Sequence, residues 1–221
     1  MTPKLDGPRV PPARQGRPSS LVILLHGYGS NGDDLIALAP YWAGALPETQ
    51  FVSPNAPEGI PGYPGGRQWF GLARMDAATL NAGAAKAAPA LNAFIDSEME
   101  RYGVGPAQTA LVGFSQGTMM ALYTALRREK ALAGVVGFSG ALVSPEGLEA
   151  EMRAKPPILL AHGDRDDVVP VTALFEALNG LAKAGHGAEL HLCAGLAHSI
   201  APSGLERGGA FLKAAFAGRL R

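Results

Sequence analysis

Residues 109–117 read TALVGFSQG, and this stretch predicts the fold of the chain. The run TALV is apolar throughout, which is typical of a strand buried on both faces, and the residues after Gly117 have the pattern of a helix. Gly113 and Gly117 flank Ser115, so a tight and strained turn between strand and helix meets no bulky neighbour. Gly-x-Ser-x-Gly in this context predicts that Ser115 is a nucleophile at the sheet edge, where the helix N-terminus favours developing negative charge.

Two alternatives compete with this interpretation. Ser115 can be a simple helix cap, a role that serine often fills. Ser139 also follows a buried strand, in the segment Phe138-Ser139-Gly140-Ala141, but this segment lacks the complete Gly-x-Ser-x-Gly pattern. We therefore favour Ser115 as the nucleophile.

Apolar runs of the same kind recur along the chain. Four are continuous, at 21–25 (LVILL), 109–112 (TALV), 134–138 (GVVGF) and 157–161 (PILLA), and two weaker ones lie at 50–53 and 188–193. Helical patterns lie between them, at about 33–46, 77–102, 116–130, 145–154, 171–185 and 203–218. Strand and helix thus alternate, which predicts the α/β class, with a mostly parallel central sheet flanked by helices on both faces.

Residues 54–76 have neither pattern and are rich in proline and glycine. We expect them to form a long irregular loop, and loops of this length in compact proteins are usually functional or disordered. Tyr63 and Trp69 argue against disorder, because a solvated tail has little use for large aromatic side chains.

Composition limits the classes of function. The chain has 19 Lys and Arg against 19 Asp and Glu, with no block of like charge, so nothing favours nucleic acid or an anionic membrane as a partner. The single cysteine, Cys193, excludes an internal disulfide, and neither a signal peptide nor a membrane span is evident. We expect residues 1–221 to form one cytoplasmic domain.

A serine nucleophile needs a histidine base and a carboxylate that orients it, and in this kind of sheet the order is Ser, acid, His. His198 is the best placed base, because it follows the last predicted strand, whereas His162, His186 and His191 suit structural positions. The acid must follow the run PILLA, where Asp164, Asp166 and Asp167 compete.

These segments together resemble the bacterial phospholipase/carboxylesterase family of α/β-hydrolases, which also includes acyl-protein thioesterases. The resemblance covers nearly the whole chain and rests on LHGYG at 25–29, DDL at 33–35, PNAP at 54–57, GRQWF at 66–70, GFSQG at 113–117, HGDRDDVVP at 162–170 and GLAHSI at 195–200. The family pattern His-Gly-x-x-Asp-x-x-Val-Pro implies that Asp166 is the acid, with Asp167 as the alternative. It also implies an oxyanion hole made by the backbone N–H groups of Tyr28 and Gln116, whose side chains need not matter.

The resemblance implies a serine carboxylesterase that needs no cofactor, and no metal-binding motif is evident. A lysophospholipase, an acyl-(protein) thioesterase and a non-catalytic binding protein are the alternatives. The substrate is a small-molecule ester, and a homodimer is in keeping with related esterases. We expect the substrate to contact an apolar wall formed by Tyr63, Trp69, Phe70, Leu72 and Phe114.

Overall fold

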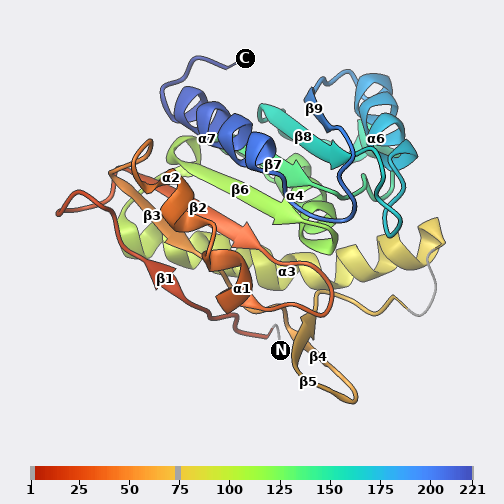
Figure 1. The fold of residues 1–221 in the computed structure, drawn as a ribbon, viewed down its shortest axis with the longest axis horizontal. Coiled ribbons are helices and arrows are strands. Elements are labelled where there is room, and N and C mark those ends of the chain that lie inside the picture. Colours follow the sequence, from red (N-terminus) through yellow and green to blue (C-terminus); the bar gives the residue numbers. More distant parts are fainter. Residues whose placement is uncertain (1–2, 73–75, 221) are drawn as a thin grey trace.

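The computed structural model describes residues 3–72 and 76–220, and a seven-stranded sheet forms its centre (Figure 1). The strand order is β1-β3-β2-β6-β7-β8-β9, and every neighbouring pair is parallel except β1 with β3. The strands are β1 (Arg9–Val10), β2 (Ser20–Leu25), β3 (Thr49–Val52), β6 (Thr109–Phe114), β7 (Gly134–Phe138), β8 (Ile158–Gly163) and β9 (Glu189–Cys193). The predicted fold class is confirmed.

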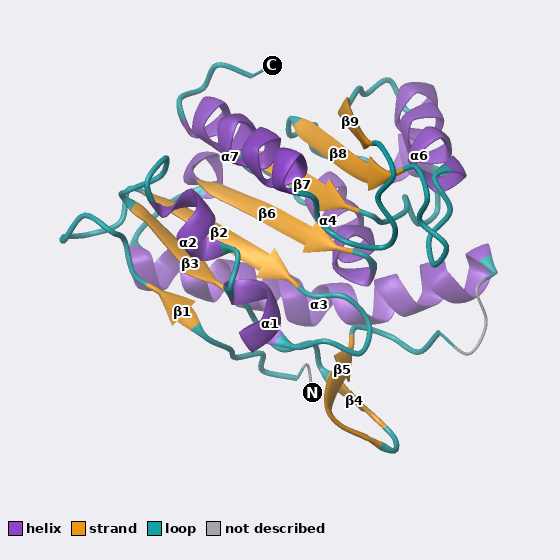
Figure 2. Cartoon of the chain, in the orientation of Figure 1, coloured by secondary structure: helices purple, strands orange, loops and turns teal. Residues whose placement is uncertain are grey.

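Helices cover both faces of this sheet (Figure 2). One face carries α3 (Ala77–Tyr102), α4 (Gln116–Arg127) and α6 (Thr172–Lys183), and the other carries α1 (Gly32–Ile36), α2 (Ala39–Ala43) and α7 (Pro202–Phe216). Alternate residues of β2 enter the two cores, with Leu21 and Ile23 on the α3 face and Val22 and Leu24 on the α7 face. This double burial explains why the strand sequences are continuously apolar.

Three local predictions differ from the structure. The helical pattern at 33–46 is divided into α1 and α2, with Pro40 in the first turn of α2, where its missing N–H costs nothing. The pattern at 145–154 forms only the short helix α5 (Leu148–Glu151). The segment expected to be an irregular loop contains a hairpin of β4 (Glu58–Ile60) and β5 (Tyr63–Gln68), which projects from the main sheet in Figure 1. Residues 73–75 of that segment lie outside the described residues.

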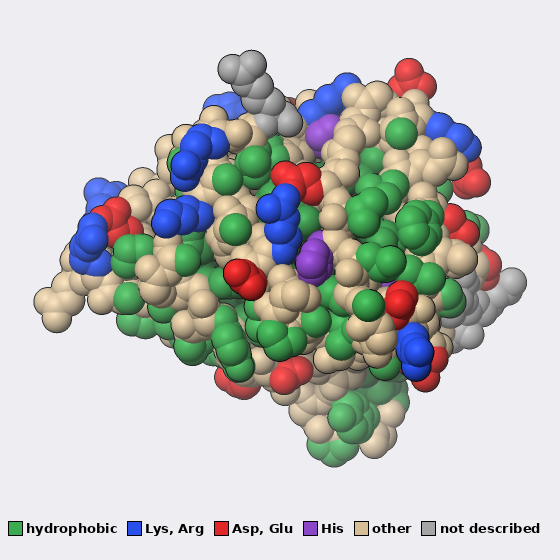
Figure 3. Space-filling view, turned by 45° about the horizontal axis from the view of Figure 1, so that its top comes forward, with side chains coloured by type: hydrophobic (Ala, Val, Ile, Leu, Met, Phe, Trp, Pro, Cys, Tyr) green, Lys and Arg blue, Asp and Glu red, His purple; other side chains and the backbone are tan. Residues whose placement is uncertain are grey.

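The surface agrees with the balanced composition. Figure 3 shows acidic and basic side chains interspersed with apolar ones on the face that it presents. In the described parts of the chain, no helix has both the length and the apolar character needed to cross a membrane.

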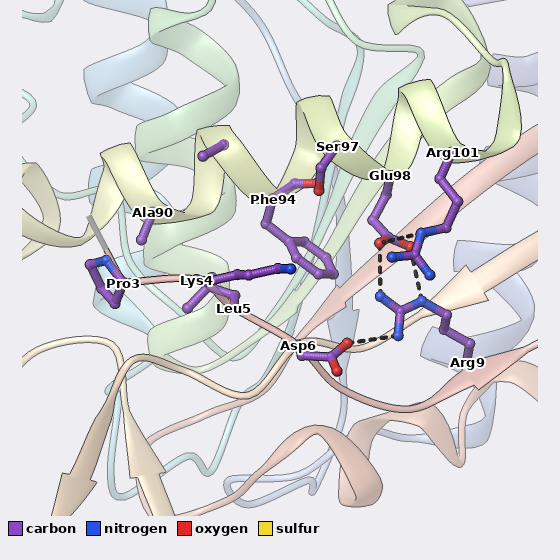
Figure 4. Close-up of a pocket in the computed structure, with 11 residues that line it drawn as sticks. Pro3, Lys4, Leu5, Asp6, Arg9, Ala90, Phe94, Ser97, Glu98 and Arg101 are labelled. Atoms are coloured by element: carbon purple, nitrogen blue, oxygen red, sulfur yellow. Dashed lines mark hydrogen bonds and ion pairs between the residues drawn. The ribbon is translucent and has the colours of Figure 1, made fainter. Parts of the chain in front are cut away.

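The N-terminal segment is attached to α3 by one ion-pair cluster (Figure 4). Arg9 donates from Nε and Nη2 to the two carboxylate oxygens of Glu98, at 3.0 and 2.7 Å, and from Nη1 to Asp6 at 2.7 Å. Glu98 is buried, and Arg101 contacts the same carboxylate at 3.3 Å. A buried carboxylate is tolerated only with such partners, so this pairing holds the start of β1 against α3.

Replacement of Glu98 should destabilise the fold. Glu98→Ala removes the buried carboxylate that Arg9 and Arg101 share, and we expect the free energy of unfolding to fall by about 3 kcal/mol in urea titrations. Glu151→Ala is the matched control, because the Arg127–Glu151 pair has a carboxylate that is half exposed, and its loss should cost less than about 1 kcal/mol. Equal losses in the two variants would contradict a structural role for the Glu98 cluster.

Candidate active site

Ser115 occupies the sharp turn between β6 and α4. Its backbone angles are φ 54° and ψ −119°, a conformation that L residues rarely adopt, and its N–H donates to the Phe138 carbonyl of the neighbouring strand at 2.9 Å. Such strain persists only where the surroundings impose it, and it is typical of functional sites. The turn therefore has the conformation that the Gly-x-Ser-x-Gly pattern predicts.

The glycines of this motif are required by close backbone packing. A Cβ atom added to Gly117 would lie 1.8 Å from the carbonyl oxygen of Leu25, at the end of β2. A Cβ atom added to Gly113 would lie 2.4 Å from the carbonyl carbon of Gly117. Both distances are far below van der Waals contact, so glycine is needed at residue 113 for the turn to close and at residue 117 for it to approach β2.

Asp166 and His198 lie beyond the ends of β8 and β9, and they are hydrogen bonded to each other. His198 Nδ1 donates to Asp166 Oδ2 at 2.8 Å, which leaves Nε2 as the free acceptor of the neutral ring. The His198 ring packs on Phe114, with 4.8 Å between ring centroids. Because Phe114 directly precedes Ser115, this contact brings the imidazole beside the turn that carries the serine.

Asp166 is held in its charged form. Burial alone would raise the pKa of Asp166, but the hydrogen bond from His198 and those from the backbone N–H groups of Val169 and Val168, at 2.8 and 3.0 Å, together hold this pKa below its ordinary value. The carboxylate is therefore ionised at neutral pH. It can orient the imidazole of His198 and stabilise its protonated form.

The other two aspartates of this loop do not meet His198. Asp164 accepts a hydrogen bond from the backbone N–H of Gly195 at 2.6 Å, which ties the loop after β8 to the loop after β9. Asp167 is exposed. Of the three candidates, the structure brings only Asp166 to the histidine.

The site is supported by contacts of His162 and Ser139 that the sequence does not reveal. Buried His162 donates from Nε2 to the Val169 carbonyl at 2.8 Å, and the same nitrogen lies 3.4 Å from Asp166 Oδ2. The hydroxyl of Ser139 donates to the Ser199 carbonyl at 3.3 Å and so supports the loop that carries His198. Neither set of partners is evident from a single sequence: Ser199 lies 60 residues from Ser139, and the partners of His162, only four and seven residues away, depend on how the loop after β8 folds.

The loop after β2 lies beside the nucleophile. A Cβ atom added to Gly27 would be 3.2 Å from the Cβ of Ser115. In the described chain, the N–H groups of Gly29 and Ser30 are bonded to the carbonyls of Arg67 and Gly27, whereas no backbone hydrogen bond engages that of Tyr28. Gln116 begins α4, where the first N–H groups have no helical acceptor.

The residues expected to form an apolar wall lie in different environments. Trp69 is 1% exposed and belongs, with Phe70, to the core on the α3 face. Tyr63 is 57% exposed, whereas Leu72 and Phe114 are half-buried. Among the residues described, no group of three or more His, Cys, Asp and Glu side chains is placed to hold a metal ion.

The sheet order and the turn at Ser115 define an α/β-hydrolase, and comparison with known proteins identifies the family to which the chain belongs. A profile of the phospholipase/carboxylesterase family matches residues 8–216. The chain belongs to this family and is a hydrolase of carboxylic ester bonds. The resemblance stated from the sequence is thus confirmed.

Relatives of known name agree with this assignment. The chain is 31% identical to acyl-protein thioesterase 1 of Saccharomyces cerevisiae over 93% of its length and 94% of the relative's. It is 30% identical to esterase YpfH of Escherichia coli, over 81% and 76% of the two lengths. The crystal structure of esterase PE8 superposes with a TM-score of 0.90 at 50% identity, covering 95% of this chain and 98% of that one.

The packing around Gly117 gives a direct test of the turn. Gly117→Ala forces a methyl group against the Leu25 carbonyl, and we expect the melting temperature to fall by roughly 6–12 °C, for a cost of about 3 kcal/mol. Gly187→Ala is the control, since a Cβ atom there meets nothing within 4 Å. A Gly117→Ala protein as stable as the control would show that β2 and α4 do not approach so closely.

Proposed function

We propose that Ser115, His198 and Asp166 are the catalytic triad of a serine carboxylesterase. The observation that carries this assignment is the 2.8 Å hydrogen bond between His198 Nδ1 and ionised Asp166, beside a serine held at φ 54°. The bond makes Nδ1 the donor, so Nε2 is the nitrogen of the neutral tautomer that can accept a proton. An acyl transfer to serine requires a histidine oriented in this way by a carboxylate, which supports the assignment.

The reaction follows from these positions. Ser115 Oγ attacks the ester carbonyl carbon while His198 Nε2 takes the hydroxyl proton, and Asp166 stabilises the imidazolium that forms. The tetrahedral oxyanion accepts hydrogen bonds from the N–H groups of Tyr28 and Gln116. The C–O bond to the leaving group then breaks, and the alcohol departs with the proton from His198. Water attacks the acyl-enzyme by the same route and releases the carboxylic acid and free Ser115.

The acyl group would lie against the predicted apolar wall. Tyr63 and Phe114 are the members most open to contact, since Tyr63 is exposed and Phe114 packs beside His198. Leu72 is half-buried, whereas Trp69 and Phe70 would support the wall from within the core.

A second candidate is hydrolysis of acyl thioesters, with lysophospholipids as a third substrate class. The relative named acyl-protein thioesterase, which aligns over nearly the whole chain, favours the thioester. Oxygen and sulfur esters need the same catalytic groups and differ in the leaving group and the length of the acyl pocket. Rates on p-nitrophenyl esters and acyl-thioesters of matched, increasing chain length separate the candidates.

Three further properties belong to this proposal. Residues 1–221 act as one domain, the protein is cytoplasmic, and it forms a homodimer. The support for a reducing compartment is that the only cysteine, Cys193, is buried and unpaired. Light scattering of the purified protein tests the dimer.

The nucleophile can be tested by covalent labelling. A fluorophosphonate should phosphonylate Ser115, as located by mass spectrometry of peptides, and Ser115→Ala should lower kcat on the order of 10⁵- to 10⁶-fold. Ser139→Ala is the matched control, because this buried serine also has a positive φ at the end of a strand, and it should still be labelled at Ser115. Labelling at another residue, or none, would overturn the assignment.

The acid can be tested with isosteric amides. Asp166→Asn should lower kcat about 10⁴-fold, because an amide cannot stabilise the imidazolium and favours the wrong histidine tautomer. Asp164→Asn keeps an oxygen that can accept from Gly195, and Asp167→Asn alters an exposed side chain, so both should remain close to wild type. An inactive Asp167→Asn beside an active Asp166→Asn would make Asp167 the acid.

A further inference from the structure

We infer that the side chains of Gln116, Trp69 and His26 form a buried chain of hydrogen bonds that positions the two halves of the oxyanion hole relative to each other. The inference rests on the proposed function, because it assigns to these side chains the placement of the Tyr28 and Gln116 N–H groups. Gln116 would thus act twice, as a donor through its backbone and as a positioning residue through its side chain.

The chain begins at the amide of Gln116, which is 1% exposed. Its Oε1 accepts from the backbone N–H of Trp69 at 2.9 Å, and its Nε2 donates to the carbonyl of Phe70 at 2.7 Å. Both partners are backbone groups with fixed roles, so the orientation of the amide is unambiguous. The first residue of α4 is thereby bonded twice to the segment that follows β5.

The indole of Trp69 continues the chain. Its Nε1 donates to the carbonyl of His26 at 3.0 Å, and the two rings lie 5.8 Å apart. His26 begins the loop that contains Tyr28, so Trp69 joins the Gln116 half of the oxyanion hole to the Tyr28 half. Because Trp69 is enclosed in the core, supporting the loop is a better defined role for it than contact with substrate.

His26 transmits this position to the neighbouring peptide. Its Nε2 accepts from the N–H of Ala56 at 2.9 Å, so this nitrogen is unprotonated, and its Nδ1 donates to the Gly27 carbonyl at 2.8 Å. Burial lowers the pKa of His26, which keeps the ring neutral and this tautomer fixed. The Gly27 carbonyl belongs to the same peptide unit as the Tyr28 N–H, so the His26 ring holds the plane in which that donor lies.

The far side of the loop is held by the hairpin. The Gly29 N–H donates to the Arg67 carbonyl at 2.9 Å, and the Arg67 N–H donates to the Ser30 carbonyl at 2.9 Å. The Arg67 side chain donates from Nε to the Ala56 carbonyl at 2.8 Å. The Tyr28 peptide is therefore fixed on both sides, by groups that all belong to residues 56–70 or contact them.

The fixed orientation of the two N–H donors should affect the rate of the reaction as well as the stability of the fold. An oxyanion hole acts through donors already oriented toward the charge that develops, so a small displacement of either donor lowers the rate of acyl transfer while substrate binding changes little. A purely structural role predicts a loss of stability with kcat unchanged. The ratio of the effects on kcat and KM distinguishes the two roles.

The chain offers matched controls for both side chains. Trp69→Phe removes the indole donor, and Trp42→Phe removes an indole that donates to the Leu205 carbonyl at 2.8 Å and is 2% exposed, between α2 and α7. Gln116→Met removes a buried amide but keeps the backbone N–H. Its control is Gln50→Met, which removes a buried amide that lies in β3, beside the edge strand β1, and donates to the carbonyls of Val10 and Phe51.

Steady-state kinetics on a p-nitrophenyl ester provide the test. We expect Trp69→Phe and Gln116→Met to lower kcat about 10- to 100-fold with KM changed less than about threefold. A trifluoromethyl ketone inhibitor forms a tetrahedral adduct with the serine, and its affinity for these variants should fall in proportion to kcat/KM. Trp42→Phe and Gln50→Met should lower the melting temperature by similar amounts and leave kcat within about twofold.

The outcomes separate this inference from the proposed triad. If wild-type protein is not labelled by a fluorophosphonate at Ser115, the proposed function fails. If it is labelled, but Trp69→Phe and Gln116→Met keep the wild-type kcat, or the controls lose as much activity, the triad stands and the positioning role is wrong.

Discussion

The packing of the turn after β6 against the end of β2 is the constraint on which the rest of the site depends. Gly117 lies directly against the Leu25 carbonyl, and no side chain fits between them. This contact places the start of α4 beside the loop that follows β2, so Ser115, the first helical N–H and the Tyr28 loop come together from segments about ninety residues apart in the printed sequence. The glycines of the motif therefore determine how closely α4 approaches the end of β2 as well as the shape of one turn.

Parallel strands then bring the remaining groups to the same edge. Because β6, β7, β8 and β9 run side by side in one direction, the loops that follow them share one end of the sheet. Ser139, Asp166 and His198 each lie just beyond one of these strands, and each contacts a loop that follows another of them. The site is thus a set of short loops that brace one another above a rigid sheet.

Much of this arrangement could be predicted from the sequence, because its signals are local. Four continuous apolar runs and two weaker ones predicted six of the seven strands of the main sheet, and α3 has the predicted limits at residues 77 and 102. The strand β1 has only two residues and gives no such run. The choice of Asp166 among three neighbouring aspartates needed the family pattern, since spacing alone does not say which carboxylate turns toward the next loop.

What the sequence could not predict depends on contacts between distant segments. The β4–β5 hairpin is rich in proline and glycine, so its residues do not have the composition of a strand. The sequence shows Gln116 only as a variable residue of the Gly-x-Ser-x-Gly motif. The role of its side-chain amide depends on two backbone partners that lie 46 and 47 residues away. The place of Trp69 in the long loop predicts a position at the wall of the pocket, and the sequence gives no sign that its indole N–H has a polar partner inside the core.

The positive φ of Ser115 also limits which side chain can perform the chemistry. At φ 54° a β-branched residue would bring its second γ atom against its own backbone, so threonine, although it carries the same hydroxyl, is poorly suited to this turn. An unbranched side chain, serine or cysteine, is compatible with it. The geometry of the main chain thus selects a primary alcohol over a secondary one before any substrate is bound.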